Sequence, residues 1–255
     1  ASNQRRRMKI LVIGESCVDI YQYGDSVRLC PEAPVPVFNS NGVRNTNGGM
    51  AMNVYNNIKS LIDEDGITVD IHTNLDWEKI TKKRYVDFRT NYIVVRVDEN
   101  ENLYGSCLTR TIDFDQYDVV VISDYNKGFL SPADIQYISK QPPITFLDTK
   151  KILGEWCDSV NYIKINDVEY GKTAHSVTEK LKNKMIITMG PDGCEFLGER
   201  YPVPKVEIKD AAGAGDTFIA ALAVEYVRSR SLNKAIVYAN ECATRVVQLK
   251  GVGTA

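Results

Sequence analysis

Paired cysteines and clustered histidines are what this sequence most clearly lacks. Its two histidines, His72 and His175, stand far apart and are expected at the surface. Six cysteines are scattered without one C-x-x-C pair, which argues against both a zinc site and a disulfide framework. Most of them are expected to be small buried apolar residues. The sequence therefore predicts a reducing compartment, the cytoplasm.

Long apolar runs and an excess of basic charge are also absent. No run approaches the ~20 residues of a membrane span, and KILVIG is too short for a secretion signal. A formal net charge of −2 gives no general affinity for nucleic acids or membranes, so neither is an expected partner. The basic cluster Arg5 to Arg7 precedes Met8. We expect residues 1–7 to be a tag remnant or a disordered end, with a nucleic-acid arm as the alternative.

What the sequence does contain is a regular alternation of strands and helices. Continuous apolar runs predict the buried strands of a parallel sheet in KILVIG, DVVVIS, ITFLD, NYIKIN and KMIITM. Two strong helices are predicted in TFIAALAVEYVRSR and LNKAIVYANECATRVVQL. The pattern predicts one α/β domain over residues 8–255, with helices flanking a mostly parallel central sheet.

Two segments interrupt this alternation and are expected to form a small β-sheet lid. Residues 28–40 contain three prolines and can only be extended at a sheet edge. Residues 82–110 alternate well enough for two strands that turn near Asn91. Polar clusters follow four strands, at residues 15–19, 123–124, 148–150 and 166–169. Because ligands bind outside the carboxyl ends of parallel strands, these clusters predict one shared cleft beneath the lid.

The stretch KDAAGAGDTF, residues 209–218, carries the strongest chemical signal. Small residues let main-chain N–H groups converge on an anion, and the helix that follows adds its positive end. No G-K-[S/T] follows, so the stretch is not a Walker P-loop. The residues alone leave two alternatives open. The glycines could form a plain strand-to-helix turn, and Asp216 could cap the helix instead of acting as a base beside a phosphate.

Four motifs together resemble those of the ribokinase-like (PfkB) carbohydrate kinases. DAAGAGDTFIAAL is similar to that family's C-terminal signature, NGGMAMNVYNNI to its N-terminal one, NDVE to its N-x-x-E metal motif and TMGPDG to its T-x-G-x-x-G nucleotide turn. They occur in the family's order and span most of the chain. CPEAPVPV, KKRYVDFRTNYIVVRVD, SDYNKG and DTK resemble the heptose 7-phosphate kinase branch. The resemblance implies a ribokinase-like three-layer sandwich with a lid, and a homodimer formed through that lid.

The resemblance further implies an ATP-dependent kinase that phosphorylates a hydroxyl of a sugar or sugar phosphate. Asp216 would be the general base, beside an anion hole formed by Gly213, Ala214 and Gly215. Mg²⁺ would be organised by Asn166 and Glu169, and a monovalent cation such as K⁺ by Asp210. The nucleotide-binding positions match Asn166, Thr188, Gly190, Gly193 and Asn240.

A second set of positions matches those that bind the acceptor. Asp19 and Asn53 would hydrogen-bond sugar hydroxyls, with Gly48 and Gly49 giving them room. A phosphate already on the sugar would be held by Arg84, Arg96 and Lys127. Structural alternatives stay open for all these residues: helix caps, a helix start at Asn166, a plain turn at Gly190, a turn-stabilising Asp210, a solvent-facing Asn240 and solvated surface charges.

The sequence departs from the family pattern in ways that keep a second function open. Ala211 replaces the usual threonine, Tyr55 stands where a small residue is preferred, and the chain stops near where a last strand would begin. Between Leu61 and Thr81 only about twenty residues replace a longer segment that flanks the sugar pocket. The alternative is a catalytically weak paralogue that binds a nucleotide or sugar or acts as a regulatory protein. A dinucleotide-dependent oxidoreductase is disfavoured, because no G-x-G-x-x-G follows the first strand.

Overall fold

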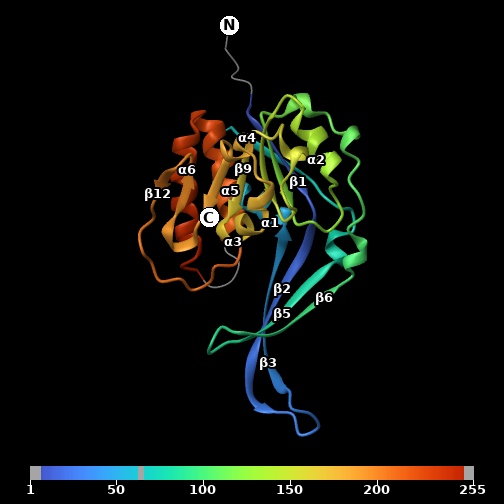
Figure 1. The fold of residues 1–255 in the computed structure, drawn as a ribbon. Helices are drawn as coiled ribbons and strands as arrows, with labels where there is room; N and C mark the ends of the chain where they lie inside the picture. Colours follow the sequence, from blue (N-terminus) through green and yellow to red (C-terminus); the bar gives the residue numbers. More distant parts are fainter. Residues whose placement is uncertain (1–6, 63–65, 250–255) are drawn as a thin grey trace.

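The main sheet is eight-stranded and mostly parallel. In the computed structural model, which describes residues 7–62 and 66–249, its order is β12-β11-β10-β9-β8-β7-β1-β4 (Figure 1). The strands from β10 through β4 pair in parallel, and β11 and β12 add an antiparallel hairpin. Their bounds are β1 (Lys9–Gly14), β4 (Thr68–His72), β7 (Val119–Asp124), β8 (Ile144–Thr149), β9 (Tyr162–Asn166), β10 (Met185–Thr188), β11 (Cys194–Phe196) and β12 (Glu199–Tyr201). The predicted α/β class is confirmed.

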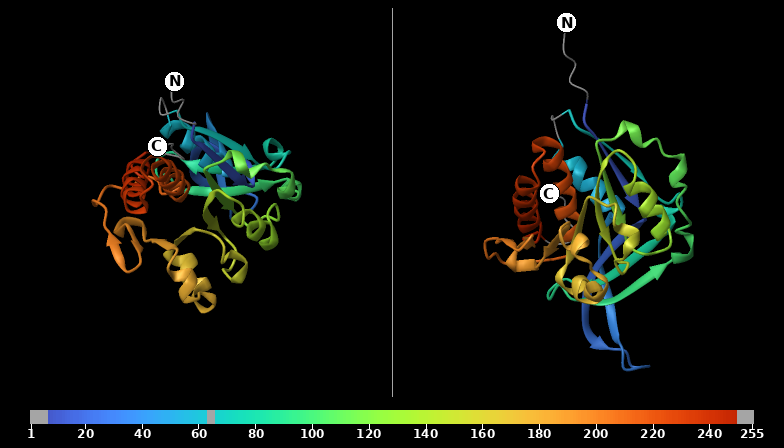
Figure 2. Two further views of the ribbon diagram at one scale, coloured as in Figure 1. Left: turned by 90° about the horizontal axis from the view of Figure 1, so that it is seen from above. Right: turned by 45° about the horizontal axis from the view of Figure 1, so that its top comes forward.

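Helices cover both faces of this sheet, which gives the three layers visible in Figure 2. Successive residues of a strand point to opposite faces. Ile10 and Val12 of β1 therefore pack on one side, and Leu11 and Ile13 on the other. The first side carries α1 (Ala51–Leu61), α5 (Ala214–Ser229) and α6 (Leu232–Val246). The second carries α2 (Pro132–Ser139), α3 (Asp167–Thr173) and α4 (Glu179–Lys182).

A separate four-stranded sheet, the lid sheet, projects from this body in the order β3-β2-β5-β6 (Figure 1). Its strands are β2 (Ser16–Leu29), β3 (Pro36–Met50), β5 (Thr81–Asp87) and β6 (Ile93–Glu99). Only Glu15 separates β1 of the main sheet from β2 of the lid sheet. Pro36 begins an edge strand, where its missing N–H costs no ladder bond. Asn91, in the β5–β6 turn, has a positive φ of 60°. The expected second sheet is thus present, and β2 and β3 make it longer than predicted.

The short segment after Leu61 still supports the lid sheet. It supplies β4, which pairs in parallel with β1, and then Asn74. The buried Asn74 side chain accepts from Ser16 N at 2.7 Å and donates to Ser16 O at 3.2 Å, which fixes the start of β2. Single-turn 3₁₀ helices complete the described chain at Trp77–Lys79, Glu101–Leu103, Thr109–Thr111, Phe114–Gln116, Glu155–Cys157, Ala174–Ser176 and Gly190–Asp192.

Within residues 7–62 and 66–249, no helix combines the length and the apolar character that crossing a membrane requires.

All six cysteines are free, and five of them are buried, as expected. His72 is half-buried rather than at the surface. The predictions for residues 1–6 and for the chain end at 251–255 lie outside the described residues.

Candidate active site

The glycine run forms the N-terminus of α5. Gly213 is the N-cap, with a φ of 80° that favours glycine, and the helix begins at Ala214. Helix N-termini present N–H groups that have no partner within the helix. A β-carbon on Gly215 would lie 2.8 Å from the ammonium nitrogen of Lys164, which arrives from β9 and is itself paired with Asp148 at 2.9 Å. Backbone donors and a buried cation therefore converge on the start of this helix.

Two cavities meet at this helix start and gather most of the predicted residues. The first, here called the apolar cavity, has a volume of about 230 Å³. Of the predicted residues, its walls contain Thr188, Gly190, Gly193, Ala214, Gly215 and Asn240. The second, here called the polar cavity, has a volume of about 220 Å³. Its walls contain Asp19, Asn53, Arg84, Arg96, Lys127, Gly213 and Asp216.

Asp216 is a buried carboxylate in the wall of the polar cavity. Its Oδ2 accepts from Asn53 Nδ2 at 2.9 Å, and its Oδ1 accepts from the Tyr125 hydroxyl at 2.8 Å. Burial raises the pKa of Asp216 to about 6. The two hydrogen bonds and the Lys164 charge oppose this rise in pKa, and the Asp148 charge adds to it. With a pKa of about 6, the Asp216 carboxyl group can gain or lose a proton near neutral pH.

A buried polar network holds this carboxylate between α1 and α5. Asn57 Nδ2 donates to the Asn53 backbone oxygen at 2.8 Å, and Thr217 Oγ1 donates to Asn57 Oδ1 at 2.9 Å. All three side chains are at most 4% exposed. Because buried amides keep their geometry when their bonds are satisfied, this network fixes Asn53 toward Asp216. Asn53, predicted to bind the sugar, therefore also contacts the predicted base.

Asp19 lies opposite, on β2, and depends on a glycine. Its Oδ1 lies 2.6 Å from Arg84 NH1. A β-carbon on Gly49 of β3 would lie 2.4 Å from its Oδ2, so only glycine leaves room for this carboxylate. A β-carbon on Gly48 would instead lie 2.2 Å from Cγ of Met52. Of the two predicted glycines, it is therefore Gly49 that makes room for Asp19.

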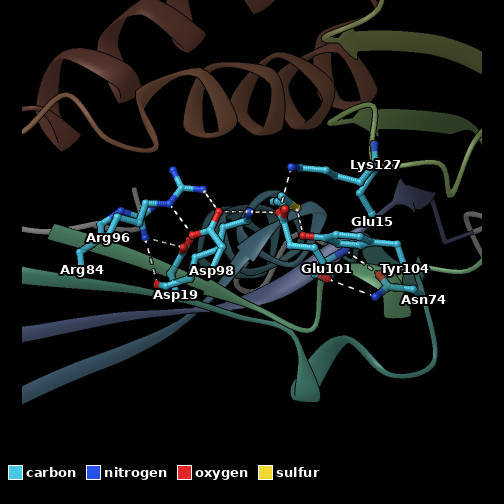
Figure 3. Close-up of polar contacts among 12 residues, drawn as sticks. Glu15, Asp19, Asn74, Arg84, Arg96, Asp98, Glu101, Tyr104 and Lys127 are labelled. Atoms are coloured by element: carbon cyan, nitrogen blue, oxygen red, sulfur yellow. Dashed lines mark hydrogen bonds and ion pairs between the residues drawn. The ribbon is translucent and has the colours of Figure 1, made fainter.

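The basic side chains of the polar cavity are all paired with carboxylates (Figure 3). Arg96 contacts Asp98 through Nε and NH2, both at 2.7 Å. Lys127 and Lys82 both reach Glu101, at 2.9 and 2.8 Å. Neither Lys82 nor Lys164 was predicted as a site residue. Each carried a signal, since Lys82 opens the K-K-R stretch and Lys164 is a lone lysine inside an apolar strand.

The turn and helix residues of the apolar cavity are held by backbone contacts. Gly193 has a φ of 83°, and a β-carbon there would lie 2.0 Å from the Tyr201 carbonyl oxygen. Asn240 of α6 is 7% exposed and donates to the same oxygen at 3.0 Å, so the solvent-facing alternative is wrong. Thr188 Oγ1 lies 3.4 Å from the Ile165 carbonyl oxygen. The cavity is otherwise lined mainly by apolar side chains, a surface that suits a planar aromatic ring of a ligand.

The predicted metal residues form a capping box at the start of α3. Asn166 Oδ1 accepts from Glu169 N at 2.7 Å, and Glu169 Oε2 accepts from Asn166 N at 3.2 Å. Glu169 Oε1 contacts Lys150 Nζ. Oxygen ligands suit Mg²⁺, but with these atoms engaged the arrangement fits contact through the ion's water shell. The buried Asp148 Oδ1, which has no hydrogen-bond partner among the described residues, lies 4.0 Å from the same ammonium group.

Asp210, the predicted monovalent-cation residue, accepts from Ala212 N at 2.8 Å, as a turn-stabilising aspartate would. In the described part of the chain, no three His, Cys, Asp or Glu side chains are grouped so as to hold a metal ion.

Comparison with known proteins agrees with this architecture. The model of the pfkB family of carbohydrate kinases matches residues 152–255. The bifunctional protein HldE of a Nitratiruptor species is 31% identical over 97% of this chain and 63% of its own length, so the chain spans less than two thirds of that relative.

Solved structures show the same fold. The ribokinase of Thermotoga maritima has a TM-score of 0.67 at 18% identity, over 96% of this chain and 94% of its own. Arabidopsis thaliana ribokinase, solved with ribose and ATP, has a TM-score of 0.64 at 17% identity, over 96% and 94%. The chain therefore has a ribokinase-like fold, and its residues 152–255 are similar to the pfkB family of carbohydrate kinases.

Proposed function

We propose that the protein transfers the γ-phosphoryl group of ATP to a hydroxyl of a sugar or sugar phosphate. The observation that carries the proposal is the placement of Asp216 at the helix start where the apolar and polar cavities meet. A nucleotide in the apolar cavity and an acceptor in the polar cavity would approach each other there. The Arabidopsis ribokinase, which has the same fold, was solved with a sugar and a nucleotide together, ribose and ATP.

In this proposal each group has one task. Asp216 takes the proton of the acceptor hydroxyl as the bond to the phosphorus atom forms. The N–H groups from Gly213 to Gly215, with Lys164 beside them, stabilise the charge on the transferring phosphoryl oxygens, and the Ala214 N–H shifts to this task from the Ala211 carbonyl oxygen, 3.3 Å away. Asp19 accepts from acceptor hydroxyls, and the basic residues of the polar cavity bind a phosphate on the acceptor.

Magnesium would be held through its water by Asn166 and Glu169, where its charge would neutralise phosphate oxygens. The monovalent cation at Asp210 remains a prediction.

The acceptor is best tested by measuring ADP release with hexoses, heptoses and their phosphates, heptose 7-phosphate included. We expect turnover with at least one member above that of the Asp216→Asn control. If none exceeds the control, the protein is instead the catalytically weak paralogue, acting as a nucleotide- or sugar-binding or regulatory protein, that the shortened segment after Leu61 leaves open.

The pH dependence of turnover should report Asp216. The base must be ionised, and burial places its pKa at about 6. We therefore expect kcat/KM to fall as pH is lowered through about 6 and to level off above it. Steady-state ADP release between pH 5 and 8 measures this, and a profile that is flat across that window would contradict the role of Asp216.

We also propose that the protein is a homodimer joined through the lid sheet. Ile93, Val95 and Val97 lie two residues apart on β6 and expose 53%, 48% and 39% of their surface, an apolar stripe on one strand face. Light scattering should give about twice the chain mass of 28.6 kDa. Val95→Asp should shift the protein to monomer, whereas Val237→Asp, equally exposed at 48% on α6, should not.

A further inference from the structure

Lys82 is a buried ammonium group in the wall of the polar cavity. Its side chain is 5% exposed, and Nζ lies 2.8 Å from Glu101 Oε1 and 3.3 Å from Asp98 Oδ2. The same Glu101 oxygen lies 2.9 Å from Nζ of Lys127 (Figure 3). One carboxylate thus bridges a lysine of the lid sheet and a lysine of the loop after β7. A buried cation needs such an anion, because leaving it unpaired is costly.

The four side chains of this cluster, Lys82, Asp98, Glu101 and Lys127, differ in their freedom to move. Asp98 is tied to Arg96 by two contacts of 2.7 Å. Lys82 is enclosed, and the backbone N–H of Lys127 is anchored to the buried Glu15 at 2.7 Å. The Glu101 side chain is 40% exposed and lies outside the lid strands, in the 3₁₀ helix that follows β6. Glu101 is therefore the most exposed member of the cluster and can swing into solvent, while the enclosed Lys82 stays in place and the Lys127 side chain, 33% exposed, stays at the cavity wall.

The charges around Glu101 indicate which kind of ligand could take its place. The basic side chains of the polar cavity are Lys82, Arg84, Arg96 and Lys127, and the carboxylates paired with them are Asp19, Asp98 and Glu101. When Glu101 leaves, two positive charges are in surplus. A phosphate monoester carries close to two negative charges at neutral pH and three acceptor oxygens. It therefore matches the vacated position in both charge and hydrogen bonding.

We propose that Glu101 is a built-in anion that occupies the phosphate subsite of the acceptor, and that a sugar phosphate displaces it from Lys82 and Lys127. The inference rests on the proposed function and narrows it, because it names a phosphorylated acceptor over a neutral sugar. Glu101 then determines specificity by competition. A neutral sugar cannot replace it, whereas an anionic one takes over both lysines.

The displacement of Glu101 can be tested by measuring ligand binding directly, without any turnover. Isothermal titration of the full chain, without ATP, is performed with inorganic phosphate, glucose 6-phosphate and glucose. For Glu101→Gln we expect the Kd of both phosphates to fall by roughly tenfold, because the competing charge is removed, and that of glucose to stay the same. Glu99→Gln is the matched control, since Glu99 ends β6 and contacts the Thr81 hydroxyl at 2.9 Å. Its Kd values should equal those of the unmodified protein.

Equal or weaker phosphate binding by Glu101→Gln would overturn the proposal, as would the absence of phosphate binding from both proteins. Lys82→Met should lose phosphate binding, with circular dichroism to verify folding. The Glu101 comparison decides the matter if that variant does not fold. Tighter phosphate binding without any kinase turnover would leave this subsite standing and reject the kinase, so the two proposals fail separately.

Discussion

Replacing Asp216 by asparagine is expected to lower kcat/KM by roughly 10²–10⁴-fold, the usual contribution of a general base. The amide is nearly the same size and can still accept from Asn53, but it cannot take a proton from the acceptor hydroxyl. ADP release with the best acceptor measures the loss, and nucleotide affinity should be unchanged, because the side chain faces the polar cavity. Retention of more than a tenth of the activity would remove Asp216 from the mechanism.

Stability provides the control for this variant. The folded protein holds the Asp216 proton up to a pH of about 6, whereas the ordinary pKa is 3.8. Ionisation of Asp216 therefore costs folding stability as pH rises from about 4 to 6, and the cost persists above that range. The neutral amide avoids this cost, so at pH 7 the urea midpoint of Asp216→Asn should equal or exceed that of the unmodified protein.

Gly193→Ala is expected to lower the free energy of unfolding by about 3–4 kcal/mol, through backbone strain and overpacking. Its φ of 83° disfavours any β-carbon, and that carbon would lie 2.0 Å from a main-chain oxygen that cannot move alone. Urea unfolding at pH 7 measures the change. Nucleotide binding should weaken too, since the turn lines the apolar cavity.

Gly198→Ala separates the two causes. Gly198 lies in the hairpin that joins β11 and β12, with a φ of 77°, but a β-carbon there meets nothing within 4 Å. We expect it to cost only about 1–2 kcal/mol, the strain of a left-handed residue. If the two variants were equally destabilised, contact with the Tyr201 carbonyl would not be the reason that Gly193 is glycine.

The sequence predicted the parts of the site that adjoin a single element. The apolar strand runs and the glycine run before α5 are local signals. The structure confirms the strands and the helix, which begins three residues earlier than predicted, at Ala214 within the glycine run. Asp19 and Gly49 were predicted together, and their contact explains the glycine. The extent of one domain over residues 8–255 stays a prediction.

Contacts between distant elements could not be read from the sequence. Whether Lys82 meets Glu101 depends on how β5 pairs with β6, which sets Lys82 opposite Asp98. The strands β2 and β3 are rich in polar residues, so no apolar run marks their length. Tyr125 reaches Asp216 across 91 positions, a contact that only the packing of α5 on the sheet creates.

The direct passage from β1 into β2 makes the base of the lid sheet stiff. From Val18 to Gly24, β2 is sandwiched between β3 and β5, and the irregular pairings with β3 begin only after Gln22. Beyond Gly24 it has a single neighbouring strand. Thermal bending therefore concentrates in the outer hairpin, while Asp19 and Arg84 keep their spacing. The wall of the polar cavity that β2 and β5 supply is accordingly formed before any ligand binds.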